Sequence, residues 1–126
     1  MITWLLLGTG LYVVTLFIPS LFLISKIGVG AYLGSRDAEP LANAIHGRAQ
    51  RVVRNFGESY PPFAVLGILS LVVADADVAM ASTGAMIFVI ARVAYIPLYL
   101  AAVPALRSGA YLIGLAGVVM IGLSLI

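Results

Sequence analysis

The chain has 126 residues and a formal net charge of +2, with 63% hydrophobic and only 10% charged residues. Soluble domains carry about 25% charged residues, so this chain has too little polar surface to coat a water-soluble globule. The composition therefore indicates an integral membrane protein. The mild excess of basic residues is then explained by membrane orientation and not by nucleic-acid binding.

Membrane-spanning helices need about 20 mainly apolar residues, and four such segments fill nearly the whole chain. We expect a single domain over residues 1–126, an all-α four-helix bundle with helices at about 2–25, 41–74, 78–101 and 109–126. The first segment is interpreted as a retained helix rather than a signal peptide. No basic region precedes it, and its apolar run exceeds the roughly 7–15 residues of a signal sequence. Pro19 predicts a kink near its end.

The second helix follows a polar connection from Lys26 to about Pro40. The three glycines of this connection indicate a flexible turn rather than a phosphate-binding loop, since no strand precedes them and no GK[ST] motif follows. The helix is polar in its first half, contains Pro61 and Pro62, and is purely apolar only from Phe63 to Ala74. That apolar part is too short to span a bilayer. We therefore infer one long helix, kinked at the prolines, with its polar half at the interface or inside the bundle.

The third helix carries Arg92 in an otherwise apolar stretch, with Pro104 after its end, and the turn at residues 107–109 leads to the fourth. Basic residues gather on one side of this topology, while the turn between the second and third helices carries only Asp75 and Asp77. The positive-inside rule places the basic side in the cytoplasm and both termini opposite. The basic residues are Lys26, Arg36, Arg48, Arg51, Arg54 and Arg107.

The densest polar group lies at residues 46–60, in the sequence HGRAQRVVRNFGESY. Residues three, four and seven apart share a helix face, so Arg48, Arg51, Asn55 and Glu58 form one polar stripe. The stripe is either a solvated face near the membrane surface or a binding site, because ionisable groups at membrane depth usually face a partner or a cavity. A metal site is not expected, since cysteine is absent and a single histidine is too few for zinc.

A second polar stripe lies on the third helix, where Arg92, Tyr95 and Tyr99 follow +3 and +4 spacing. The tyrosines are either an interfacial aromatic belt or part of a site. Arg92 is either one half of a structural ion pair, with Glu58 as candidate partner, or a direct ligand. Together the stripes suit a small zwitterion, because arginine binds carboxylates bidentately and a glutamate accepts an ammonium group.

Two motifs resemble those of the MAPEG family, the membrane-associated proteins of eicosanoid and glutathione metabolism. The first is RxxRN followed by a glutamate three residues after the asparagine and a nearby Tyr-Pro, which here spans residues 51–61. The second is ARVAY at residues 91–95, followed by Tyr99 and then by Arg107-Ser108. The resemblance covers essentially the whole chain, as four helices in the same order.

The resemblance implies a homotrimer in the bilayer that binds glutathione between neighbouring subunits near the cytoplasmic side. By position, Arg107 is the implied catalytic residue, which stabilises the glutathione thiolate. The implied activity is that of a glutathione transferase or peroxidase acting on lipophilic electrophiles, with isomerisation also open. The implied glutathione contacts are Arg51, Asn55, Glu58, Tyr95 and Tyr99, with Arg48 and Arg92 as further candidates.

Two other functions stay open. A small four-helix proton-coupled exporter has the same size and hydropathy, but such transporters commonly use a carboxylate in the first helix, and residues 1–25 contain none. A non-enzymatic scaffold or regulator of the same fold is the second alternative, and retention on a glutathione column from detergent separates it from the binding functions.

The predicted topology can be tested with cysteines, because the chain has none of its own. Arg36→Cys is expected on the cytoplasmic side and Asp75→Cys on the opposite side, since basic loops are retained inside. An impermeant thiol reagent applied to intact cells should therefore label only the cysteine at position 75. Equal labelling of both from outside would refute the arrangement.

Overall fold

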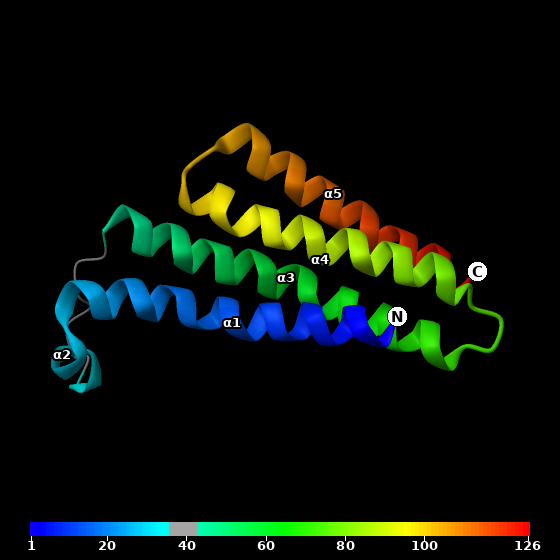
Figure 1. Cartoon of the computed structure of the whole chain (residues 1–126), viewed down its shortest axis with the longest axis horizontal. Coiled ribbons are helices and arrows are strands. Elements are labelled where there is room, and N and C mark those ends of the chain that lie inside the picture. The colour runs from blue at the N-terminus through cyan, green and yellow to red at the C-terminus, as the bar shows by residue number, and fades with distance from the viewer. Residues whose placement is uncertain (36–42) are drawn as a thin grey trace.

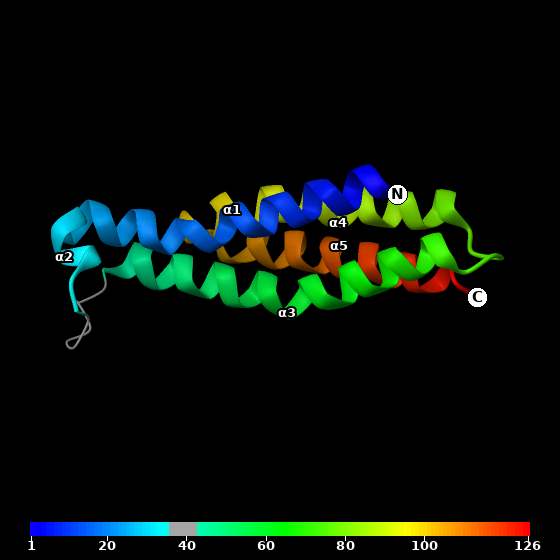
Figure 2. The ribbon, with the colours of Figure 1, turned by 90° about the horizontal axis from the view of Figure 1, so that it is seen from below.

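The computed structural model describes residues 1–35 and 43–126, and no strand occurs within those ranges (Figure 1). Four long helices run side by side, whereas a fifth helix is a short turn at one end of the bundle (Figures 1 and 2). The prediction of an all-α protein is confirmed. The helices are α1 (Ile2–Ile27), α2 (Val29–Leu33), α3 (Ala44–Val72), α4 (Val78–Leu100) and α5 (Pro104–Leu123).

Three of the helices, α1, α4 and α5, are long and apolar enough to cross a membrane, with mean hydropathies of 2.0, 1.7 and 1.7. These spans support an integral membrane protein. Helix α3 has 29 residues but does not belong to this group, because its first half carries the polar stripe. A membrane crossing by α3 therefore stays a prediction.

The last helix begins at Pro104, so the predicted start at residue 109 is wrong. Proline is favoured at the first helical position, where its missing N–H is no loss and its fixed φ suits the helix. The sequence analysis instead places Pro104 after the end of the preceding helix, in the connection to the last one. Arg107 and Ser108 consequently lie in the first turns of α5 and not in a connecting turn.

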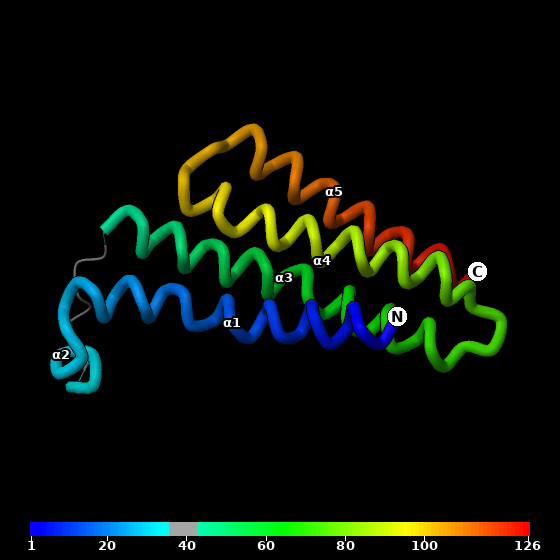
Figure 3. Tube along the Cα trace, in the orientation of Figure 1, coloured from blue at the N-terminus to red at the C-terminus, as the bar shows by residue number. Residues whose placement is uncertain are grey.

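Helix α3 begins at Ala44 because Asn43 caps it. The Asn43 side-chain oxygen accepts a hydrogen bond from the His46 backbone N–H at 2.9 Å. The prediction that this helix starts near residue 41 falls outside the described residues. Pro61 and Pro62 lie inside α3, and the helix runs through them without a break (Figure 3).

Aromatic rings form the centre of the bundle, where α3 packs against α4. Phe63 stacks on Phe88 with ring centroids 4.3 Å apart, and Phe56 meets Phe88 edge-on at 6.1 Å. Helix α1 covers this cluster closely, because a Cβ added at Gly8 would lie 2.7 Å from the Phe63 ring. The aromatic core therefore fixes α3 between α1 and α4.

Helices α4 and α5 approach each other through glycines. A Cβ added at Gly117 would lie 2.5 Å from the Gly84 carbonyl oxygen and 2.9 Å from the Phe88 nitrogen. A Cβ added at Gly84 would in turn lie 2.6 Å from the Gly117 oxygen. Because both backbones leave no room for a side chain, these glycines set the separation of the two helices, as small residues do between membrane helices.

This contact predicts a position-dependent effect of alanine. Gly117→Ala should lower the free energy of unfolding by about 1–3 kcal/mol, because the new methyl group overpacks the α4–α5 contact. Gly109→Ala is the matched control on the same helix, since nothing lies within 4 Å of its added Cβ. It should be stabilising by about 1 kcal/mol through helix propensity. Circular dichroism during reversible unfolding in micelles provides the measurement, and equal stability of the two variants would contradict this packing.

Candidate functional site

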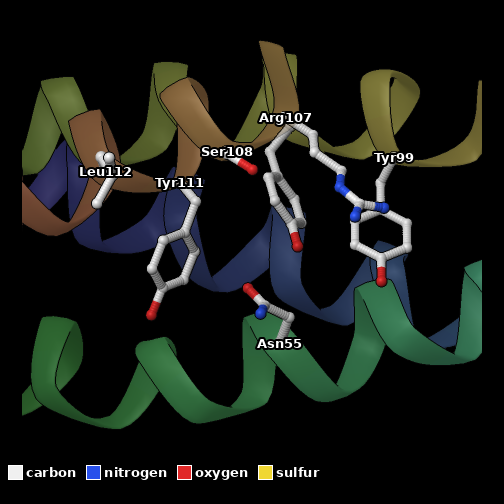
Figure 4. Close-up of a pocket in the computed structure, with 7 residues that line it drawn as sticks. Asn55, Tyr99, Arg107, Ser108, Tyr111 and Leu112 are labelled. Atoms are coloured by element: carbon white, nitrogen blue, oxygen red, sulfur yellow. The ribbon is translucent and has the colours of Figure 1, made fainter. Parts of the chain in front are cut away.

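One pocket collects polar side chains from three helices, and its volume is about 380 Å³. Asn55 points up from α3, while Tyr99 and Tyr111 point down towards α3 from α4 and α5, and the Arg107 side chain extends over the Tyr99 ring (Figure 4). Its lining residues on α4 and α5 flank the turn between these two helices. That turn lies at the end of the bundle opposite to the two chain termini (Figure 1). Its lining residues are Asn55, Tyr95, Tyr99, Arg107, Ser108, Tyr111 and Leu112.

The turn between α4 and α5 brings Tyr99 and Arg107 together. Its backbone N–H groups at Val103 and Ala102 donate to the carbonyls of Leu98 and Tyr99 at 3.0 and 3.1 Å. This pair of hydrogen bonds is the Schellman pattern, which requires a left-handed residue after the helix and usually employs glycine there. Here Ala102 occupies that position with φ 58°, the only non-glycine residue of positive φ in the described parts of the chain.

Arg107 is the cation of the pocket wall. Its guanidinium carbon lies 4.5 Å from the centre of the Tyr99 ring, within the range of a cation–π contact. Tyr95 contacts Tyr99 at 5.4 Å and Tyr111 at 6.4 Å between ring centroids. The pocket thus joins one guanidinium, three phenols, a serine hydroxyl and an amide, which suits an anionic ligand with further polar groups.

Arg92 lies behind this wall instead of lining the pocket. Its side chain is only 1% exposed, and its terminal nitrogen donates a hydrogen bond to the Asn55 side-chain oxygen at 3.2 Å. No ion pair joins Arg92 to Glu58, whose side chain is exposed, within the described residues. The predicted ion pair between Arg92 and Glu58 is therefore wrong within one chain, and Arg92 is hydrogen-bonded to the side-chain amide of Asn55 instead.

The polar stripe of α3 is divided along its length. Positions 48 and 55 lie about 60° around the helix axis from positions 51 and 58, as the helical repeat of about 100° per residue requires. Asn55 faces the pocket and Arg48 is half-buried, whereas Arg51 and Glu58 are exposed. Arg51 instead lines a separate hollow of about 370 Å³ together with Gly47, Gln50 and Arg54. Within one chain the structure therefore unites Asn55, Tyr95, Tyr99 and Arg107, but leaves Arg48, Arg51 and Glu58 outside that pocket.

Tyr111 and Leu112 were not recognised from the sequence as site residues. Tyr111 follows Arg107 by four residues, so the two share a helix face. The sequence analysis misses this shared face because it predicts that the helix begins at residue 109, after Arg107. No group of three metal-binding side chains comes together in residues 1–35 and 43–126.

The apolar spans define a helical membrane protein, and the cationic, phenol-lined pocket is its candidate functional site. The MAPEG family model matches residues 1–126, and the chain belongs to the MAPEG family. Comparisons with curated proteins and with solved structures gave no significant match.

Proposed function

We propose that this chain is a glutathione-binding membrane enzyme, a glutathione transferase or peroxidase that stabilises the glutathione thiolate with Arg107. The observation that carries the proposal is Arg107 itself, a fixed cation in the wall of a polar pocket of a MAPEG-family chain. The pocket volume of about 380 Å³ falls within the range of about 300–1,000 Å³ that is typical of small-molecule sites.

Arg107 supplies the electrostatic part of the reaction. A thiol has an ordinary pKa near 8.5, and only its thiolate attacks electrophiles. A cation within a few ångströms lowers the pKa of an acid by about 1–3 units, which strongly increases the fraction of thiolate at neutral pH. The thiol proton leaves to bulk water, because arginine remains protonated and accepts none. The Tyr99 ring beneath the guanidinium restricts its movement and keeps it directed into the pocket.

The edge of the pocket suits a lipophilic second substrate. Leu112 lines the pocket and is nevertheless 61% exposed, so it joins the site to the apolar surface of α5. An electrophile dissolved in the bilayer reaches the thiolate along such a surface without passing through water. In conjugation, the sulfur–carbon bond forms as the leaving group of the electrophile departs with the bonding electron pair. With a hydroperoxide, the sulfur bonds to the terminal oxygen as the O–O bond breaks and an alcohol is released after protonation. A second glutathione molecule then reduces the resulting sulfenic acid, which gives glutathione disulfide and water.

Assembly as a homotrimer completes the site in this proposal. Glutathione has two carboxylates and one ammonium group, but the pocket of one chain contains a single guanidinium and no carboxylate. Arg51 and Glu58 supply the missing charges, yet they face outwards from α3. A neighbouring copy that packs against this face brings them to its own pocket, in keeping with the subunit-interface sites that the family resemblance implies.

The thiolate role of Arg107 leads to a specific expectation. Arg107→Ala should bind glutathione within a few-fold of wild type, but raise the pKa of the bound thiol by about 1–3 units and slow turnover. Ultraviolet difference absorbance of the thiolate as a function of pH is the measurement. Arg107→Lys should restore part of the effect, and Leu106→Ala, at an exposed neighbouring position, should behave like wild type. Unchanged pKa and rate in Arg107→Ala would make Arg92 or Arg48 the better candidate.

A site shared between subunits predicts that the protein forms a trimer, and that removing the charges of Arg51 or Glu58 lowers the affinity for glutathione. Native mass spectrometry in mild detergent should show three subunits. Arg51→Ala and Glu58→Gln should weaken glutathione binding by about one to two orders of magnitude, the cost of losing a charged hydrogen bond. Asp75→Asn is the control, since it also removes a charge but lies between α3 and α4, at the other end of α4 from the pocket residues Tyr95 and Tyr99. A monomer that binds glutathione with full affinity would contradict a site shared between subunits.

A further inference from the structure

Arg92 presents an unusual problem, a buried guanidinium without a carboxylate. It is the largest fully buried side chain in the described parts of the protein, at 1% exposure, and no acidic residue described there pairs with it. Its Nε is buried with no hydrogen-bond partner. Burying an unpaired charge in a membrane protein is costly, and such residues generally have a functional reason.

Aromatic rings take the place of the missing carboxylate. The guanidinium carbon lies 5.2 Å from the ring centres of both Tyr95 and Tyr111, 5.3 Å from Phe88 and 5.6 Å from Phe56. All four distances are within the roughly 6 Å range of cation–π attraction. The rings restrict the position of the charge but leave it un-neutralised, so its field remains available to groups nearby.

Two of these rings, and the one hydrogen-bond acceptor that Arg92 has among the described residues, belong to the pocket wall. Tyr95 and Tyr111 both line the pocket and contact Arg92, and Asn55 lines the pocket and accepts a hydrogen bond from Arg92 through its side-chain oxygen. A guanidinium can only donate hydrogen bonds, so the oxygen of the Asn55 amide is held towards Arg92. The NH₂ group of that amide is then left for the pocket.

We infer that Arg92 is a positioning residue, which acts through Asn55 by fixing its amide as a hydrogen-bond donor to the bound ligand. This inference rests on the proposed function, since it assigns to glutathione a carbonyl or carboxylate oxygen at the Asn55 NH₂ group. Arg92 itself does not contact the ligand. The same buried cation makes the pocket selective for an acceptor at this point, because an amide turned the other way would face Arg92 with two unmatched donors.

The link between the two residues can be tested without glutathione. Asn55→Asp places a carboxylate where the amide oxygen accepts from Arg92, and so supplies the absent counter-ion. It should raise the melting temperature by about 3–6 °C. In an Arg92→Met background the same change should lower it, because the new carboxylate then has no partner. An equal shift in both backgrounds would show that Arg92 and position 55 are not coupled, and would overturn the inference even in a protein that does not bind glutathione.

The positioning role is tested by a double-mutant cycle for glutathione affinity, measured by calorimetry. Arg92→Met and Asn55→Ala should each weaken binding by about ten-fold, and the double variant should be no weaker than the worse single one. Arg92→Lys keeps a hydrogen-bond donor on a slightly shorter side chain. Where Asn55 is present, it should recover most of the glutathione affinity that Arg92→Met loses. In the Asn55→Ala variant it should recover none. Asn55→Asp should fold with higher stability yet lose glutathione binding, a separation that a purely structural role does not produce.

The outcomes distinguish the two hypotheses. Additive losses, or a rescue by Arg92→Lys that persists in Asn55→Ala, would show that Arg92 acts independently of Asn55 and would overturn the inference. Wild-type protein that does not bind glutathione, but shows the predicted melting shifts, would refute the proposed function. The hydrogen-bond link between Arg92 and Asn55 would then still hold, with the ligand of a different class.

Discussion

The close approach of α4 and α5 is the constraint on which the pocket depends. Because Gly84 and Gly117 have no side chains, the two backbones approach so closely that a Cβ atom at either position would clash. The Schellman turn at Ala102 then reverses the chain within a few residues, so that Arg107 returns over Tyr99. Helix α5 follows α4 closely from that point on. Tyr111 therefore lies beside Tyr95, and Arg92 contacts the Tyr111 ring. A wider helix separation would open both the pocket and the aromatic enclosure of Arg92.

Polar groups in this bundle are satisfied in two different ways. Hydroxyl groups on the helices mostly donate to backbone carbonyls one turn earlier, as Thr15 and Ser70 do at 2.7 and 2.8 Å. The buried guanidinium has no such local solution, because its donors lie far from its own backbone. It depends on an amide from another helix and on ring faces, and these contacts tie α3 to α4 and α5 at the depth of the pocket. Arg92 therefore joins the three helices and also contacts the side chains that line the pocket.

Much of the fold could be predicted from the sequence, because hydropathy and helix length are local properties. The apolar segments of α1, α4 and α5 and the helical class followed from hydropathy and segment length. The start of α5 did not, because Pro104 is compatible both with the end of one helix and with the beginning of the next. The partner of Arg92 could not be predicted either. Spacing identifies which residues share a stripe, but only packing decides which edge of the stripe faces a neighbour.

That division of the α3 stripe has a consequence for where the chemistry is completed. A single chain presents Asn55 inwards and Arg51 and Glu58 outwards, although helical spacing groups all three. The outward face continues past Pro61 into the exposed apolar residues Val65 and Ile68. In the homotrimer that we propose, such a face, charged at one end and apolar at the other, packs against a second copy at the same depth in the bilayer. The apolar parts then meet, and the charges lie beside an adjacent pocket. Under that proposal the motif on α3 forms two half-sites, one serving its own chain and the other serving a neighbour.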